Sequence, residues 1–125
     1  MILADTSIWI EFLKAKFVDF QMMAGLIEEG RIFALECVFG ELLQGARAKN
    51  EKDVLLDYWL NLPKVDEQNI WIEAGVLSCD GKWFTKGVGL IDLAIVAAAR
   101  RNGLQVWTLD KKLLTVLHRS EVFDK

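Results

Sequence analysis

The sequence is short of the residues that build disulfide frameworks, zinc sites and membrane spans. Its two cysteines, Cys37 and Cys79, form no Cys-x-x-Cys pair and lie in apolar surroundings, so we expect reduced core thiols. The most apolar stretch, residues 87–99, contains Asp92 and is too short to cross a bilayer of about 30 Å. No basic stretch precedes the first apolar residues, which argues against a signal peptide. We therefore expect a cytoplasmic protein without a membrane partner.

Positive charge is also scarce, because 15 basic residues stand against 18 acidic ones and the net charge is −3. No global positive field of the kind that attracts nucleic acid is expected, so any such partner must be recognised locally. Carboxylates grouped around a cation would also give an acidic balance, because the sequence does not count the cation. Apolar residues are plentiful at 53%, which is enough to bury the core of one domain over residues 1–125.

Short apolar runs alternate with helical patterns along the chain. Strands are predicted at residues 1–4, 31–35 and 104–109, with weaker candidates near Val65 and at residues 122–123. Helices are predicted at residues 8–13, 18–29, 39–45, 53–60, 67–84, 90–101 and 111–118. Strands that alternate with helices form parallel sheets covered on both faces. We therefore predict an α/β fold of three layers, α/β/α, with a central parallel sheet of four to five strands.

Four acidic residues either follow strands or lie in the opening turns of helices, namely Asp5, Glu41, Asp92 and Asp110. Ligands of open α/β sheets bind beyond the carboxyl ends of the strands, where these residues would gather. Each residue alone could simply cap a helix or face solvent. Together, four carboxylates in one pocket would repel one another unless a cation occupied it. Oxygen ligands favour Mg²⁺ or Mn²⁺ over metals that thiolates or imidazoles bind.

The segments around these acids resemble those of PIN-domain ribonucleases, most closely the VapC-like toxins of bacterial and archaeal toxin–antitoxin pairs. They occur in the family's order over nearly the whole chain and read ILADTSIWI at 2–10, GELLQGAR at 40–47, GLIDLAIVAAA at 89–99 and WTLD at 107–110. The resemblance implies a PIN-like fold. It also implies a set of catalytic, metal-binding acids and supporting hydroxyls, which are Asp5, Glu41, Asp92 and Asp110 with Thr6 and Thr108.

The activity implied by the resemblance is Mg²⁺-dependent hydrolysis of RNA phosphodiester bonds by an endoribonuclease toxin, with Mn²⁺ as a substitute. A bound divalent ion activates water and stabilises transition-state charge, so no protein nucleophile is needed. His118 is the single histidine, so the sequence cannot supply the two catalytic histidines of metal-free ribonucleases. We expect His118 to lie at the surface or to contact a phosphate. Candidate phosphate contacts lie near the acids in the sequence and are Lys14, Lys16, Arg47, Lys86 and Lys111.

The resemblance also implies partners. A VapC-like toxin has a cognate antitoxin, and we expect the helices that carry Trp9 and Trp59 to border the antitoxin groove. We further expect a homodimer. One departure concerns Lys112, which stands two residues after Asp110, where many members of the family carry a second acid. This lysine puts a full second metal site in doubt.

Three alternatives were weighed against this interpretation. A receiver-like signalling domain also places acids after parallel strands, but it has paired acids after the first strand, whereas Asp5 is unpaired and Asp92 begins an apolar helix. A PIN domain kept only for protein binding need not retain all four acids. A PIN nuclease acting on DNA stays open, since metal-dependent phosphodiester chemistry does not itself require a 2′-hydroxyl.

Overall fold

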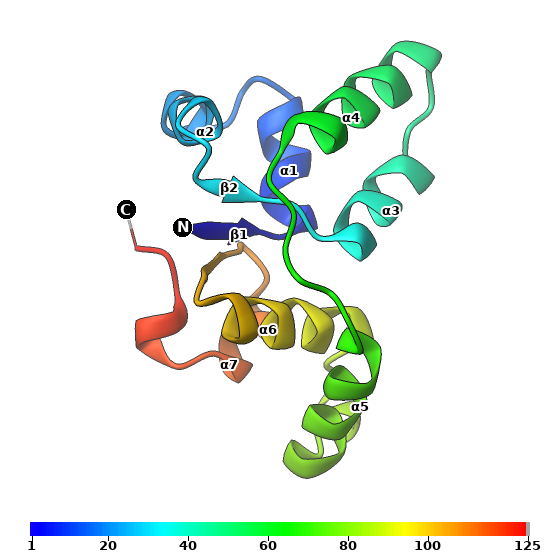
Figure 1. Ribbon diagram of the computed structural model, residues 1–125, viewed down its shortest axis with the longest axis vertical. Coiled ribbons are helices and arrows are strands. Elements are labelled where there is room, and N and C mark those ends of the chain that lie inside the picture. The colour runs from blue at the N-terminus through cyan, green and yellow to red at the C-terminus, as the bar shows by residue number, and fades with distance from the viewer. Residues whose placement is uncertain (125) are drawn as a thin grey trace.

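The computed structural model describes residues 1–124 and has a small parallel sheet between two groups of helices (Figure 1). The central strand is β1 (Ile2–Ala4), with β2 (Ile32–Phe33) on one side and β3 (Gln105–Trp107) on the other. Ile2 pairs with Ile32 and with Gln105, and both pairings are parallel. In the view of Figure 1 the first four helices lie above the sheet and the remaining helices below it. The predicted α/β layering is therefore confirmed.

Within residues 1–124, seven α-helices and two short 3-10 turns connect and cover the strands. They are α1 (Thr6–Leu13), α2 (Phe20–Glu28), α3 (Glu36–Gln44), α4 (Lys49–Asn61), α5 (Ile70–Gly81), η1 (Phe84–Lys86), α6 (Leu90–Asn102), α7 (Lys111–Val116) and η2 (Arg119–Glu121). Each of the seven predicted helices corresponds to one of these α-helices, with boundaries that differ by up to four residues. None of the described helices is long and apolar enough to cross a membrane.

The sheet has three strands over residues 1–124, where four to five were expected. The segment near Val65 forms only a single bridge, between Lys64 and Ala34, immediately after Pro63. The segment near Val122 likewise forms a single bridge to Val106. Proline has no N–H group to donate, so a strand cannot extend through Pro63 with full pairing.

The helix predicted over residues 67–84 is shorter at both ends than expected. Asn69 and Lys82, which flank α5, both adopt left-handed backbone conformations, with φ of 60° and 55°. Such residues do not continue a right-handed helix. The chain after Lys82 instead turns through η1 and enters α6.

The core lies between the sheet and the helices that cover it. Residues 93–99 of α6 are all buried, and this helix contacts both β1 and β3. Trp9 of α1 is fully buried and meets the rings of Phe12 and Phe39 edge-on. Both cysteines are free, as expected, but Cys79 is exposed on α5 and only Cys37 is partly buried. The prediction of a core thiol at Cys79 was therefore wrong, because α5 turns this position toward solvent.

Candidate active site

Asp5 lies directly after β1 and caps the first turn of α1. Its Oδ1 accepts hydrogen bonds from the Ser7 hydroxyl at 2.6 Å and from the Ile8 backbone N–H at 3.2 Å. Its Oδ2 accepts a hydrogen bond from the Thr108 hydroxyl. Aspartate is a favoured N-cap residue because its carboxylate satisfies a free N–H group of the first turn. The three donors hold the carboxylate in one orientation.

Burial distinguishes Asp5 from an ordinary helix cap. Its side chain is among the buried polar groups, with 4% of the residue exposed. Burial raises the pKa of Asp5 above its usual value, while the hydrogen bonds from Ser7, Thr108 and Ile8 oppose the rise. Hydroxyl donors stabilise the charged form of a buried carboxylate and fix its orientation at the sheet edge. A helix-capping carboxylate that is exposed is stabilised by water and does not need these donors.

Two hydroxyls tie the ends of β1 and β3 together. The Thr108 hydroxyl donates to Asp5 and accepts a hydrogen bond from the Asp110 backbone N–H at 2.9 Å. The Ser7 hydroxyl donates to Asp5 and accepts from the Leu109 N–H at 3.0 Å. Asp110 in turn caps α7 through a bond from the Lys112 N–H at 2.9 Å. The structure thus brings Asp5 and Asp110 to one edge, as the sequence predicted.

Glu41 reaches the same edge from the second turn of α3. Its Oε1 accepts a hydrogen bond of 2.7 Å from the Thr6 hydroxyl at the start of α1. Thr6 is therefore a supporting hydroxyl, but it supports Glu41, and Ser7 supports Asp5 instead. Ser7 was not among the site residues predicted from the sequence. The signal was the spacing of Ser7 two residues after Asp5, at which a hydroxyl can fold back onto a carboxylate.

Asp92 completes the cluster from the first turn of α6. Its pKa is raised from 3.8 to about 6, first by burial and then by the negative charges of Asp110, Asp5 and Glu41. Asp110, Asp5 and Glu41, contributed by three other segments, therefore lie within electrostatic reach of Asp92. Over residues 1–124, however, no group of three or more His, Cys, Asp or Glu side chains converges closely enough to hold one ion.

The donor chemistry of this cluster fits a hard divalent cation. All four side chains supply carboxylate oxygens, which Mg²⁺ and Mn²⁺ prefer. Burial, and then the charges of Asp110, Asp5 and Glu41, raise the pKa of Asp92, and a bound cation would favour its charged form. The hydroxyls of Ser7 and Thr6 hold the Asp5 and Glu41 carboxylates in place from outside the cluster.

The basic residues predicted to contact phosphate differ in their local partners and exposure. Lys14 pairs with Glu11 at 3.2 Å, whereas Lys86 lies 4.4 Å above the ring of Trp83 and donates to the Gly81 carbonyl. Lys16, Arg47 and Lys111 are exposed, and Lys111 begins α7 immediately after Asp110. His118 is also exposed, between α7 and η2.

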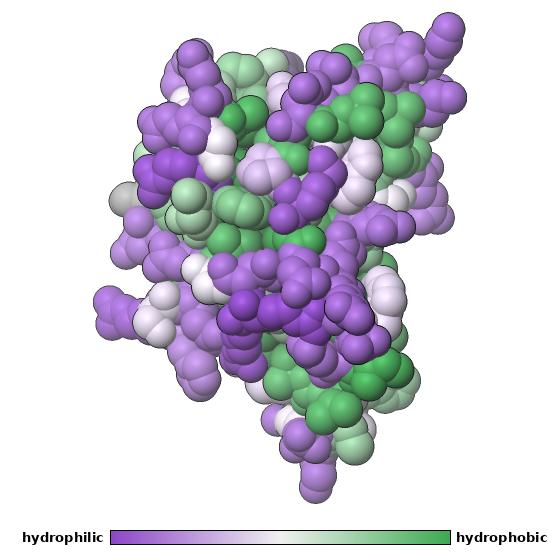
Figure 2. Space-filling view, in the orientation of Figure 1, coloured by the Kyte–Doolittle hydropathy of each residue, from purple (hydrophilic) through white to green (hydrophobic). Residues whose placement is uncertain are grey.

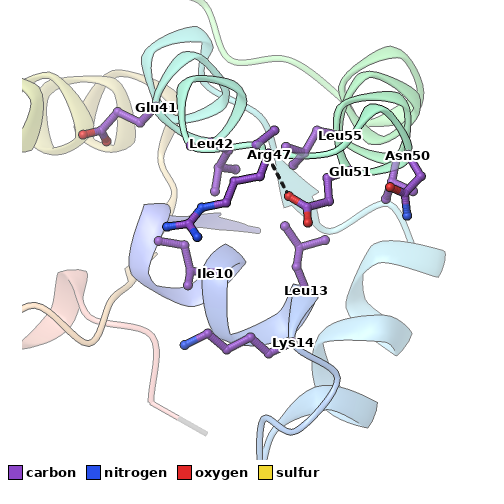
Figure 3. Close-up of a pocket in the computed structure, with 12 residues that line it drawn as sticks. Ile10, Leu13, Lys14, Glu41, Leu42, Arg47, Asn50, Glu51 and Leu55 are labelled. Carbon is purple, nitrogen blue, oxygen red and sulfur yellow. Dashed lines mark hydrogen bonds between the residues drawn. The ribbon is translucent and has the colours of Figure 1, made fainter.

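A groove of about 640 Å³ opens between α1, α3 and α4 (Figure 3). Its apolar lining includes Ile10, Leu13 and Leu55, and the Arg47 N–H donates to Glu51 at 3.0 Å across its rim. Glu41 stands at its edge and turns its carboxylate away from the groove. The groove lies between the helices that carry Trp9 and Trp59, but neither tryptophan lines it.

The chain matches known proteins over nearly its whole length. The model of the family described as PIN domain matches residues 2–117. A protein named Ribonuclease VapC32 from Mycobacterium tuberculosis, in strain CDC 1551 / Oshkosh and in strain ATCC 25618 / H37Rv, is 32% identical over 126 aligned positions. These positions cover 98% of the present chain and 94% of the relative in each case.

Proposed function

Because the chain belongs to the PIN-domain family, we propose that it is a metal-dependent endoribonuclease and the toxin of a toxin–antitoxin pair. The observation that carries the proposal is the cluster itself: the pKa of Asp92 is raised by burial and then by the charges of Asp110, Asp5 and Glu41. The similarity to a protein named as a ribonuclease supports RNA as the substrate. RNA and antitoxin would both be met in the cytoplasm, where we place the protein.

The acids that would hold the ion are Asp5, Glu41, Asp92 and Asp110, with Mg²⁺ as the physiological cation and Mn²⁺ as a substitute. When bound, a divalent ion lowers the pKa of a water molecule and stabilises the charge that develops on the phosphoryl oxygens. The protein's own part is to orient the ligands. Ser7 and Thr108 fix both oxygens of Asp5, while Thr6 fixes one oxygen of Glu41. Such outer hydrogen bonds orient metal ligands and tune their affinity.

We propose that the groove between α1, α3 and α4 receives the antitoxin. Its apolar lining suits the apolar face of an amphipathic segment, which a helical partner presents at every third or fourth residue. Glu41 belongs both to the rim of the groove and to the acid cluster. A basic side chain on the bound segment would have to extend past this rim to pair with the Glu41 carboxylate, and such a pair would oppose binding of the ion.

We also propose that a second copy of the chain covers the outer face of α5. This helix packs on α6 but leaves Trp71, Ile72 and Val76 between 47% and 71% exposed. Figure 2 shows the hydrophobic surface that gathers over α5. A helix that is apolar on both its inner and outer faces is expected to be covered on both. The resulting homodimer would hold two acid clusters.

The nuclease proposal is tested with purified protein and total cellular RNA, with Mg²⁺ and with EDTA. We expect wild type to cut RNA only with the metal, and Asp5→Asn to lose cleavage while keeping its fold, as judged by circular dichroism. Asp53→Asn is the matched control, because Asp53 is an exposed carboxylate of α4 outside the cluster. Full activity of Asp5→Asn would refute the assigned site, and cleavage in EDTA would refute the metal.

A further inference from the structure

The turn between α5 and α6 presents an aromatic ring to solvent on a well-defined backbone. Phe84, the first residue of η1, is 82% exposed. The turn is closed by hydrogen bonds to the Trp83 carbonyl from the Lys86 N–H at 3.0 Å and from the Val88 N–H at 3.1 Å. Val88 is buried and anchors the end of the turn in the core. The exposed ring therefore projects from an anchored turn.

The neighbouring side chains brace this turn from behind. The Trp83 ring packs on Gly81 so closely that a Cβ there would lie 2.2 Å from the indole Nε1. Lys86 covers the Trp83 ring, with its Nζ 4.4 Å from the centroid, and donates to the Gly81 carbonyl at 3.1 Å. Gly81, Trp83 and Lys86 thus form a support, and Phe84 is the aromatic residue of the turn that remains available to a partner.

The segment that carries Phe84 is basic, in contrast with the acidic balance of the whole chain. Residues 81–91 contain Lys82 and Lys86 and no acid. A third ammonium comes from α7, since the Nζ of Lys112 lies 3.4 Å from the position that a Cβ on Gly87 would occupy. This local charge complements a phosphate backbone.

The turn also adjoins the acid cluster along two segments of the chain. Lys112 follows Asp110 by two residues, and α6, which begins just after the turn, carries Asp92 in its first turn. The Lys112 ammonium leans toward Gly87, which places it between the turn and the start of α7. A nucleic acid strand held at the acids could therefore continue over Lys112 onto Phe84.

We propose that Phe84 is a stacking platform for one unpaired base of the RNA substrate, with Lys82 and Lys112 on the flanking phosphates. The proposal rests on the nuclease function proposed above and narrows its substrate class to single-stranded segments. An isolated aromatic ring can stack only on a base whose face is free, as in loops and single strands, whereas duplex bases are already stacked. If two copies of the chain met through this turn across a two-fold axis, the ammonium groups of one copy would face those of the other and repel them. This repulsion disfavours a dimer contact at the turn.

The test compares wild type with Phe84→Ala, Phe84→Leu and Phe84→Trp. Each complete chain cleaves an unstructured RNA oligonucleotide in Mg²⁺, alone and annealed to its complement. We expect Phe84→Ala and Phe84→Leu to raise KM for the single strand about 5- to 100-fold, the range for loss of one stacked base, with kcat within about twofold. Phe84→Trp should match wild type, because it keeps an aromatic face. Val18→Ala, at a position 89% exposed in another loop, should have no effect.

A binding measurement separates this proposal from the nuclease proposal. In the Asp92→Asn chain, which is expected not to cut, quenching of 2-aminopurine in the single strand should report stacking and should disappear when Phe84→Ala is added. Lys112→Gln should weaken the same binding and reduce its salt dependence. If wild type cuts no RNA, the nuclease proposal fails, while the quenching still tests the platform.

Two results would overturn the platform itself. One is a KM for Phe84→Ala equal to that of wild type together with unchanged quenching. The other is a changed sedimentation coefficient of Phe84→Ala with unchanged RNA binding, which would assign the turn to a protein interface.

Discussion

Replacing Asp92 by asparagine should stabilise the metal-free protein even though it removes a side chain of the proposed active site. Asp92 has a pKa of about 6 in the folded chain, against an ordinary value of 3.8, because of burial and of three neighbouring carboxylates. Where a pKa is raised by folding, the folded state holds the proton more tightly than the unfolded state. Stability is therefore lost as the pH rises from about 4 to above 6, and at pH 7 the loss is complete.

The size of this loss follows from the shift. Each pKa unit corresponds to about 1.36 kcal/mol, so a shift of about two units gives a ceiling of about 3 kcal/mol. Asp92 is partly exposed, and solvent screening reduces the effect to about 1–2 kcal/mol. Asparagine is nearly isosteric and carries no charge, so Asp92→Asn should recover this amount at pH 7 and almost nothing at pH 4.

Urea denaturation in EDTA measures the free energy of unfolding at both pH values. Mg²⁺ should reverse the ranking at pH 7, because an ion that binds only the folded state stabilises wild type and not the variant. Asp53→Asn, the exposed control, should change stability by less than about 0.5 kcal/mol. The reasoning is refuted if Asp92→Asn is no more stable than wild type in EDTA at pH 7, or if its gain is the same at pH 4.

Two further predictions concern the ligand supports and the protein partners. Titration with Mn²⁺ should show one tightly bound ion per chain, since Lys112 stands where a second acid would be, and Thr108→Val should lower the affinity for this ion about 10- to 100-fold. Thr115→Val is the control, because the Thr115 hydroxyl donates to the Lys112 carbonyl. Two equally tight ions, or an unchanged affinity in Thr108→Val, would contradict the assignment. Leu13→Asp in the groove should abolish rescue of growth by the antitoxin in co-expression assays, while sedimentation still shows a dimer. Ile72→Asp on α5 should abolish the dimer and leave the rescue intact. Equal effects of the two changes would contradict the assignment of two separate surfaces.

The gathering of the acids could be predicted from sequence because it depends on topology. Asp5 and Asp110 follow parallel strands, and the carboxyl ends of parallel strands share an edge, so their meeting needs no side-chain detail. Which hydroxyl supports which acid could not be predicted in this way. Thr6 and Ser7 are consecutive in α1, so they point in different directions and reach Glu41 and Asp5 respectively.

The basic residues were the least predictable part of the site. Lys86 was predicted to contact phosphate because it lies near the acids in the sequence. In the structure its ammonium lies above the Trp83 ring, because a cation is attracted to the face of an aromatic ring. Lys112, considered only as a departure from an acidic pattern, instead leans toward Gly87. The positions of long, flexible side chains depend on such tertiary contacts, to which a one-dimensional pattern has no access. The number of strands was also hard to predict from the sequence. A single bridge and a strand differ by only a few residues of backbone pairing, and this pairing depends on contacts between distant segments.

The placement of β1 has a consequence for the order in which the chain can mature on the ribosome. β1 is synthesised first, yet one of its two neighbours, β3, begins at residue 105, and Thr108 contacts Asp5 across 103 positions. A nascent chain that ends before residue 105 therefore has a central strand with one open edge, and its Asp5 lacks the Thr108 hydroxyl. The acid cluster can therefore assemble only after residues 105–110 have been made, and an N-terminal fragment without them is expected to show no RNA cleavage.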